Sequence, residues 1–537
     1  MSVSAPLIDL KTQKYDRQLR LWAVTGQTAL EHANICLLNA TSTGCEILKN
    51  LILPGVGSVT VVDANLVQEE DMKTNFFLEP ASLGQPKAKA VVELLQELNE
   101  DASVTFTIKE PRDVIHEDKA FFDPFTMIIA TNLHERENME LADLCEKTNK
   151  TLVIVKSKGL VGIFRIQGPE HPVIETHPEN PVDLRLGNPF AQLKQYSNSF
   201  DLDELDQTDH AHVPFIVVIL QAVEKWKKEN NGKEPQSYSE RNEIKAIIRK
   251  GMRTSDEENY EEAIANIWRL APSSSSIPSD VRQVFEDPAC NNITAQSEHF
   301  WIVARAVRDF FENEGHGRLP LPGKLPDMKS DTTNYVALQN VYRDKAKKDL
   351  AAVIGHVNAL LKANDIPENS ISQDMIESFC KNSAHIKVVR YRSLEDERVK
   401  NPETDKIVTW LENEDNMSYY MVYRAADLFH EKHKRWPGSR GGDNLEDVKL
   451  LRIEVAKVLG SLQITKEKSD ILLQQQAMEN AITNYVRFAN RETANLSALI
   501  GGLAAQEVIK LITRQYIPIN NTCVFNGISS TSAIFEL

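Results

Sequence analysis

The sequence predicts an α/β fold with a Rossmann-like, mainly parallel sheet and a large α-helical insertion. Residues 34–63 follow a strand–turn–helix–strand pattern, and short apolar runs alternate with helix-periodic stretches up to about residue 165. Parallel strands need a crossover helix, so this alternation indicates parallel order. From about residue 170 to residue 490, charged helix-periodic segments dominate, and α/β character then returns.

These patterns divide the chain into three segments. Residues 1–168 form the first part of the α/β domain, residues 169–485 the helical insertion, and residues 486–537 the second part of the α/β domain. The insertion has no fixed repeat period, which argues against a solenoid. The patterns do not decide whether it forms one lobe or two.

The first strand–helix–strand motif of the α/β domain begins with residue 34. An apolar run over residues 34–38 predicts a strand, and a helix-periodic stretch over residues 44–53 stops at Pro54. A β-branched run then ends at Asp63. An acidic residue at this position of a dinucleotide-binding unit reaches a ribose hydroxyl. Asp63 is therefore a candidate nucleotide contact.

The remaining elements of the domain follow from the same patterns. Near the C-terminus, an apolar helical stripe over residues 496–512 contains Gly501 and Gly502. Glycine inside a helix costs about 1 kcal/mol relative to alanine, so we expect another helix or a sheet to approach closely there. The other predicted elements are helices over residues 86–98 and 139–145, strands over residues 104–108, 125–130 and 152–155, and a closing hairpin of residues 516–519 and 523–525.

Charge, cysteine pattern and hydropathy exclude several classes of protein. A formal net charge of −16 argues against nucleic acid or an anionic membrane as the main partner. Six scattered cysteines without a C-x-x-C pair favour free thiols in a reducing compartment and no metal site. Residues 1–11 lack the apolar core of a signal peptide, and the longest apolar run, residues 215–220, is too short to span a membrane. We expect a cytoplasmic or nuclear protein.

The turn after the first strand corresponds to a nucleotide-binding loop that has lost its glycines. In the pattern G-x-G-x-x-G, the first two glycines allow a tight turn and the close approach of a phosphate. Asn39 and Thr41 occupy those two positions, and only the third glycine, Gly44, remains. Side chains at positions 39 and 41 would crowd a phosphate, so the sequence predicts a nucleotide-binding fold without its ligand.

Six motifs link the chain to a known family. They are YDRQLRLW (15–22), the strand–turn–helix unit ending in VVD (61–63), KSKGLVG (156–162), DHAHVP (209–214), LQNVYRDKAKKD (338–349) and IGGLAAQEVIK (500–510). The set resembles the ubiquitin-like-modifier activating enzymes, whose adenylation domain is of the ThiF/MoeB type. The two motifs within the insertion are similar to those of the regulatory, non-catalytic subunits of the neddylation activating enzyme, also called amyloid-precursor-protein-binding subunits.

The resemblance implies which groups an active half of such an enzyme needs. A glycine loop admits phosphate, an Asn-Arg pair and a lysine neutralise its charge, and an Asp-Asn pair holds Mg²⁺. This chain would therefore bind no ATP or Mg²⁺ itself, and the catalytic partner would use both. By position, the Asn-Arg pair falls on Lys73 and Thr74, so its arginine is missing. The metal-binding aspartate falls on Thr131, beside a retained Asn132. Lys87 and Arg136 match the residues of the family pattern at their positions.

The resemblance also implies a role for one arginine. In the family, an arginine of the N-terminal helix reaches across the dimer to the ATP phosphates of the partner subunit, and Arg17 has this position. The alternative is a solvated arginine beside Asp16. We expect Leu19, Leu21 and Trp22 to anchor this helix in the core.

The family's catalytic cysteine forms a thioester with the modifier, and the equivalent region of this chain is the helical insertion. That region contains only Cys290 and Cys380, and neither lies in a recognisable active-cysteine sequence. Both are expected to be buried structural thiols, so the chain would have no catalytic residue of its own.

The resemblance places a contact with the catalytic subunit near one histidine and one helix of the insertion. A solvated loop and helix are the alternative. Because His210 and His212 have no predicted carboxylate partner, neither is assigned a metal or catalytic role. The predicted interface residues are His212, Tyr335, Gln339, Asn340 and Arg343.

The resulting hypothesis is a pseudo-enzyme, the regulatory subunit of a heterodimeric activating enzyme for the neddylation modifier. Its partners would be the catalytic subunit, the ubiquitin-like modifier and, indirectly, a conjugating enzyme, with no nucleic acid and no membrane insertion. One alternative is a nucleotide-dependent oxidoreductase, against which Asn39 and Thr41 argue. The other is a helical adaptor with a vestigial Rossmann domain.

Overall fold

The chain forms two compact units, one made of residues 1–171 and 389–537 and the other of residues 172–388. The sequence predicts no signal peptide over residues 1–11. Residues 1–9 lie outside the part of the chain that the structure describes. The structure is a computed structural model that describes residues 10–177, 183–270, 277–439 and 444–537.

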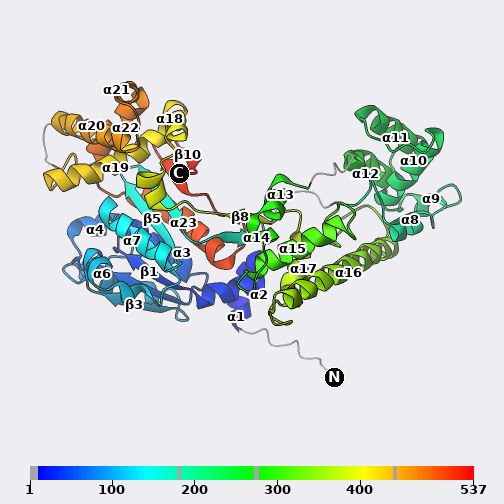
Figure 1. Cartoon of the computed structure of the whole chain (residues 1–537), viewed down its shortest axis with the longest axis horizontal. Coiled ribbons are helices and arrows are strands. Elements are labelled where there is room, and N and C mark those ends of the chain that lie inside the picture. Colours follow the sequence, from blue (N-terminus) through cyan, green and yellow to red (C-terminus); the bar gives the residue numbers. More distant parts are fainter. Residues whose placement is uncertain (1–9, 178–182, 271–276, 440–443) are drawn as a thin grey trace. The chain divides into compact units, whose positions relative to one another are not determined.

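The first unit is built on a sheet of eight strands in the described residues. They are β1 (Asn34–Leu38), β2 (Ser58–Val62), β3 (Ser103–Thr107), β4 (Met127–Thr131), β5 (Thr151–Lys158), β6 (Val161–Gln167), β9 (Thr522–Asn526) and β10 (Thr531–Phe535). Their order is β10-β9-β6-β5-β4-β1-β2-β3. Figure 1 labels β10, β5, β1 and β3 of this sheet. The strands from β3 to β5 pair in parallel, and β6, β9 and β10 are antiparallel. This arrangement confirms the predicted Rossmann-like, mainly parallel fold.

Helices cover both faces of this sheet. They are α2 (Asp16–His32), α3 (Ser42–Ile52), α5 (Lys87–Gln96), α6 (Pro111–Glu117), α7 (Glu135–Lys147) and α23 (Ala494–Thr513), whereas the short helices α1 (Leu10–Lys14) and α4 (Glu69–Thr74) are mostly exposed. Successive side chains of a strand point to opposite faces. In β1, Ile35 and Leu37 pack with α3 and α23, whereas Cys36 and Leu38 pack with α6 and α7. Both faces of β1 are therefore buried, as expected for a parallel sheet.

The C-terminal hairpin differs from the prediction. Its arms are β9 and β10, which pair antiparallel. The prediction that residues 516–519 pair with residues 523–525 is wrong, because residues 516–519 belong to the connection that follows α23. Pro518 in that connection has no backbone N–H to donate to a strand ladder.

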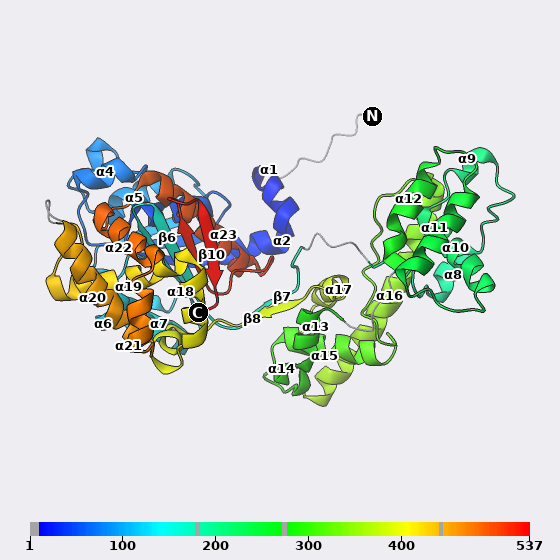
Figure 2. The same ribbon diagram turned by 90° about the horizontal axis from the view of Figure 1, so that it is seen from above.

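Five α-helices within residues 404–488 belong to the first unit and share its hydrophobic core. Met421 shares a hydrophobic cluster with Ile163 of β6 and Val524 of β9, and Figure 2 shows these helices beside β6 and β10. The prediction placed them in an insertion of residues 169–485, whereas the separate helical unit spans residues 172–388. Both regions are charged and helix-periodic, so tertiary contacts alone separate them. The helices are α18 (Thr404–Asn413), α19 (Asp415–His433), α20 (Asn444–Ser461), α21 (Lys466–Leu472) and α22 (Gln476–Phe488).

The second unit has two hydrophobic cores, and one long helix, α16 (Thr332–Ala363), contributes to both. Leu338 and Tyr342 pack in the first core, and Val353 and Leu361 pack in the second. The first core includes α8 (Ala191–Ser197), α10 (Phe215–Glu229), α11 (Tyr238–Gly251) and α12 (Glu258–Asn266), with α9 (Gln207–His210) before α10. The second includes α13 (Ser279–Glu286), α14 (Pro288–Asn291), α15 (His299–Glu312) and α17 (Gln373–Asn382), and short strands β7 (His171–Val173) and β8 (Lys387–Val389) bound the unit.

Helix α23 lies directly against α3, and Gly501 allows this approach. A Cβ atom at Gly501 would lie 2.5 Å from the Cβ of Glu46 in α3, whereas a Cβ at Gly502 would meet nothing within 4 Å. The expected close contact is confirmed at Gly501. By length and composition alone α23 could cross a membrane, but half of the apolar window is buried inside the protein, as in the core helix of a folded domain.

Replacing the two glycines separately tests this packing. Gly501→Ala should lower the free energy of unfolding by about 1–3 kcal/mol, because α3 and α23 must move apart. Gly502→Ala should raise it by about 0.5–1 kcal/mol, because alanine favours a helix and has open space there. Chemical denaturation of the two variants measures both changes. Equal effects would contradict the close contact at Gly501.

Candidate functional site: a nucleotide loop filled by the chain itself

The turn between β1 and α3 corresponds in position to a nucleotide-binding loop and has side chains at the first two glycine positions. Asn39, at the first glycine position, has a φ angle of 68°. Asparagine adopts this left-handed conformation more readily than most residues. Its side-chain amide donates to the carbonyl oxygen of Thr131 at 2.9 Å. The turn therefore forms without glycine, and the Asn39 side chain crosses to the end of β4.

Thr41, at the second glycine position, caps the N-terminus of α3. Its hydroxyl accepts a hydrogen bond from the Gly44 amide at 3.1 Å and donates to the Thr131 hydroxyl at 3.0 Å. The Thr131 hydroxyl donates in turn to the carbonyl oxygen of Asn39 at 2.8 Å. Side chains at the glycine positions and at the metal-ligand position thus bond to one another.

A carboxylate from the segment before α23 lies at the N-terminus of α3. Glu492 Oε2 accepts a hydrogen bond from the Ser42 amide at 3.0 Å, and Oε1 accepts from the Thr43 hydroxyl at 2.9 Å. Oε1 also accepts from Asn132 Nδ2 at 3.1 Å. Free N–H groups and the helix dipole favour an anion at this end of a helix. A phosphate takes this place in a nucleotide-binding loop, and a side chain takes it here.

Asp63, the candidate ribose contact, is tied to the same loop. It is buried, and its carboxylate accepts hydrogen bonds from the Ala40 amide at 2.9 Å and from the Asn65 amide at 2.8 Å. The Asn39 amide donates to the Val62 carbonyl at 2.9 Å. The acidic group at the end of β2 therefore stabilises the loop instead of facing an open crevice.

The two cations that match the activating-enzyme pattern are paired with acidic neighbours. Lys87 Nζ lies 2.8 Å from Asp71 Oδ1. Arg136 is exposed, and its Nε lies 3.3 Å from Glu140 Oε1. Thr74, in the position of the pattern's arginine, accepts a hydrogen bond from the hydroxyl of the first residue of α3 at 3.0 Å.

Arg17 differs from these cations because it is exposed on α2. Among the described residues it makes no hydrogen bond or ion pair. Asp16, its neighbour in the chain, pairs instead with Arg20 at 2.8 Å. The first unit thus presents the Arg17 guanidinium to solvent.

The cysteines have the surroundings of structural thiols. All six are buried and free. Burial raises the pKa of Cys290 to about 11 and that of Cys380 to about 12. A thioester-forming cysteine needs an accessible thiolate, so the prediction that both are buried structural thiols is confirmed. In the described ranges, no group of three or more His, Cys, Asp or Glu side chains is arranged to hold a metal ion.

Comparison with known proteins identifies the family. The model of the ThiF family matches residues 15–536. The NEDD8-activating enzyme E1 regulatory subunit of Xenopus laevis is 42% identical over 99% of this chain and 100% of that protein. The chain belongs to the ThiF family, among the NEDD8-activating enzyme E1 regulatory subunits. The subunits of the same name from Danio rerio and Drosophila melanogaster are 41% and 37% identical, over 98% and 99% of this chain and 99% of each protein.

Solved structures match only part of the chain. A crystal structure of the Escherichia coli tRNA N6-threonylcarbamoyladenosine dehydratase covers 30% of this chain and 68% of its own, at 18% identity and a TM-score of 0.27. This likeness adds nothing to the assignment among the NEDD8-activating enzyme E1 regulatory subunits, which depends on the sequence relatives.

The predicted interface of this regulatory subunit lies in the helical unit. Tyr335, Gln339 and Arg343 follow one another at the four-residue spacing of a helix face on α16, with Asn340 beside them. Asn340 and Arg343 are exposed, and Tyr335 and Gln339 are half-buried. The N-cap residue of α16 donates its amide to the carbonyl of exposed His212 at 3.4 Å. The structure therefore brings His212 to the start of this helix, and contact with a catalytic subunit stays a prediction.

His210 has a carboxylate partner that the sequence did not reveal. Its Nδ1 lies 2.8 Å from Glu257 Oε1, and its Nε2 lies 2.8 Å from the Tyr260 hydroxyl. The expectation of a histidine without a carboxylate partner is wrong. His210 is only 2% exposed, and both ring nitrogens are used within the helical core, which suits a structural role.

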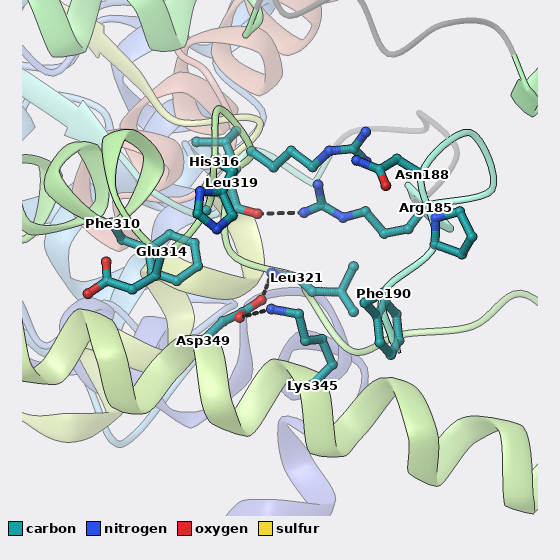
Figure 3. Close-up of a pocket in the computed structure, with 13 residues that line it drawn as sticks. Arg185, Asn188, Phe190, Phe310, Glu314, His316, Leu319, Leu321, Lys345 and Asp349 are labelled. Carbon is teal, nitrogen blue, oxygen red and sulfur yellow. Dashed lines mark hydrogen bonds and ion pairs between the residues drawn. The ribbon is translucent and has the colours of Figure 1, made fainter. Parts of the chain in front are cut away.

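The helical unit also contains a cavity of about 170 Å³ between the loop after α15 and helix α16 (Figure 3). Arg185 Nη2 donates to the Leu319 carbonyl at 2.5 Å, and the Leu321 amide donates to Asp349 at 3.1 Å. Asp349 also pairs with Lys345. These charged groups hold the loop in place, and we assign the cavity no ligand.

Glu492 is the site residue that sequence reasoning missed. It lies 450 residues from Ser42 in the chain, and it belongs to none of the motifs. The available signal is weak, namely an acidic residue in a short polar segment before an apolar helix. Asn132, which is retained from the activating-enzyme pattern, binds Glu492.

Removing the Glu492 carboxylate should destabilise the loop. Glu492→Ala removes the carboxylate that accepts from the Ser42 amide and from Asn132 Nδ2, so we expect the free energy of unfolding to fall by about 1–3 kcal/mol. Glu492→Gln keeps one acceptor oxygen but loses the charge, and its effect should be smaller. Chemical denaturation, with hydrogen exchange at the start of α3, measures both effects. An alanine variant with unchanged stability and exchange would contradict this contact.

Proposed function

We propose that this chain pairs with the catalytic subunit of the neddylation activating enzyme and completes it without binding a nucleotide itself. The catalytic subunit uses ATP and Mg²⁺ to adenylate the C-terminal glycine of the ubiquitin-like modifier. It then transfers the modifier to its own cysteine and passes it to a conjugating enzyme. This chain supplies the second half of a pseudo-twofold adenylation domain, frames the modifier-binding groove with its helical unit, and works in the cytoplasm or nucleus.

The observation that carries this proposal is the self-contained loop at the start of α3. The amides of residues 39, 40, 42 and 44 all donate to groups of the chain itself. A bound triphosphate needs free donors, open space and a carboxylate for Mg²⁺. Thr131 offers no carboxylate, and the Asn39 and Thr41 side chains fill the approach. These features favour a half-site that has kept its fold and lost its ligand.

Arg17 is the group through which this chain acts on the ATP of its partner. A guanidinium is always charged and offers several donors to a phosphate. Arg17 is exposed and unpaired among the described residues, whereas Lys87 and Arg136 pair with acidic neighbours. This distribution of cations supports donation of Arg17 to a site in trans.

Exposed apolar side chains on α2 support the proposal that this helix packs against a stable partner. Leu21 is 52% exposed and Val24 is 69% exposed. The expectation that Leu21 packs in the core beside Trp22 is wrong, because α2 leaves helical geometry at Trp22 and Ala23. Obligate interfaces commonly bury more than about 2,000 Å² with an apolar centre. The chain alone should therefore be less stable than the heterodimer.

The two alternative functions make different predictions. An oxidoreductase would bind NADH or NADPH tightly as the isolated chain, and the side chains at Asn39 and Thr41 argue against this. A helical adaptor would keep its partners after deletion of residues 1–30, with modifier activation unchanged.

ATP–pyrophosphate exchange in the presence of the modifier tests the proposal. The assay is run with this chain alone, with the catalytic subunit alone and with their mixture. We expect exchange in the mixture only, because each subunit supplies part of one site. Robust exchange by this chain alone would overturn the pseudo-enzyme assignment. Exchange by the catalytic subunit alone at the rate of the mixture would remove the need for this chain.

A further inference from the structure

Arg17 lies on a short helical segment that is separated from the rest of α2. Trp22, with a φ angle of −126°, and Ala23, with a φ angle of 55°, depart from helical geometry. A break of this kind leaves backbone groups without their helical partners, and a helical segment of this length has little stability of its own. Other contacts must hold the segment if Arg17 is to keep one position.

A side chain from the other end of the sequence bonds to the break. Gln515, which follows α23, donates from Nε2 to the carbonyl oxygen of Trp22 at 2.9 Å. Gln515 is 4% exposed, and Trp22 is also buried. The bond is therefore shielded from water, and a buried carbonyl that lost it would have no solvent to replace the donor.

The Trp22 side chain is fixed as well. Its Nε1 donates to Gln27 Oε1 at 3.1 Å, and Gln27 Nε2 donates to the Pro54 carbonyl at 3.0 Å. A Cβ atom at Gly26 would lie 2.7 Å from the Cβ of Trp22, so the ring needs a glycine at this position. The break in α2 is thus connected to the end of α3 and to Gln515.

Tyr15 fixes the other end of the segment that carries Arg17. It is buried, and its hydroxyl accepts a hydrogen bond from Asn99 Nδ2 at 3.1 Å. Asn99 Nδ2 also donates to the carbonyl of Ile52, at the end of α3, at 2.8 Å. Exposed Arg17 therefore lies between two buried, hydrogen-bonded residues.

We propose that Gln515 is a positioning residue whose amide fixes the break in α2 and so holds Arg17 in the orientation that reaches the partner's ATP. This inference rests on the proposed function, because it needs Arg17 to act in trans. Gln515 itself touches no substrate. It connects the end of α23 to the N-terminal helix, and it acts on catalysis through the backbone at Trp22.

Positioning of this kind affects rate more than assembly. The guanidinium must meet a phosphate oxygen at hydrogen-bond distance, and a displacement of about 1 Å can lower a rate by as much as a hundredfold. Without the Gln515 amide, the Trp22 carbonyl loses this donor, and residues 16–21 can adopt other orientations. Arg17 is then present but is less often correctly placed.

ATP–pyrophosphate exchange by the complete heterodimer tests this role, with assembly checked by size-exclusion chromatography. Gln515→Ala should lower kcat by about tenfold. Gln515→Glu keeps the shape of the side chain but has no N–H to donate, so it should lower kcat to a similar extent. In an Arg17→Ala background, Gln515→Ala should have no further effect, because the group that Gln515 positions is gone.

Gln167→Ala is the matched control. Gln167 is also 4% exposed, and its Nε2 donates to the Ala142 carbonyl at 2.9 Å, on the opposite face of the sheet from α2. This variant removes that buried hydrogen bond and also the one that Gln167 Oε1 accepts from the Leu394 amide at 2.7 Å, so it perturbs the core at least as much as loss of the Gln515–Trp22 bond. It should lower thermal stability as Gln515→Ala does, while leaving the exchange rate of the heterodimer unchanged.

The outcomes separate this inference from the proposed function. Normal exchange rates for both Gln515 variants would overturn the positioning role. A double variant whose loss of rate is the product of the Gln515→Ala and Arg17→Ala losses would also overturn it. Either result leaves the proposed function intact. Failure of both Gln515 variants to assemble would also overturn the positioning role, because Gln515 would then support the fold and not Arg17. Normal exchange by Arg17→Ala would overturn the action of Arg17 in trans, and the inference with it.

Discussion

The N-terminus of α3 carries a partial positive charge and free amides, and this chain neutralises it with its own carboxylate, Glu492. Because the anion is part of the chain, the loop is complete without a ligand. Asn39, Thr41 and Thr131 can then bond to one another in the space that a phosphate and a metal ion would need. The strand–turn–helix arrangement of a nucleotide site is thus retained within the ThiF-family fold.

Helix α23 and the residues on either side of it connect this loop to other parts of the first unit. Glu492, just before it, binds the start of α3, and Gly501 within it allows α23 to lie against α3. Gln515, just after it, bonds to the break in α2. One helix therefore connects the closed half-site to the segment that presents Arg17.

Local patterns predicted the features that depend on residues close together in the sequence, including the five parallel strands β1 to β5, the altered loop and the buried cysteines. They missed β6 and β10 and placed a strand wrongly at residues 516–519. They did not predict the bonds of Glu492 to Ser42 or of Gln515 to Trp22, whose partners lie 450 and 493 residues apart. They also did not separate residues 389–485 from the helical unit, because helices of both regions have the same periodicity and charge. Which helix packs on the sheet is decided by tertiary contacts that no local pattern records.

The central claim is that the loop between β1 and α3 is closed by the chain's own groups. Equilibrium dialysis of the isolated chain against radiolabelled ATP with Mg²⁺ tests it most directly, with the assembled heterodimer as the positive control. We predict no saturable binding to the isolated chain at millimolar ATP, and one bound nucleotide per heterodimer. Saturable binding of one ATP to the isolated chain would contradict the account.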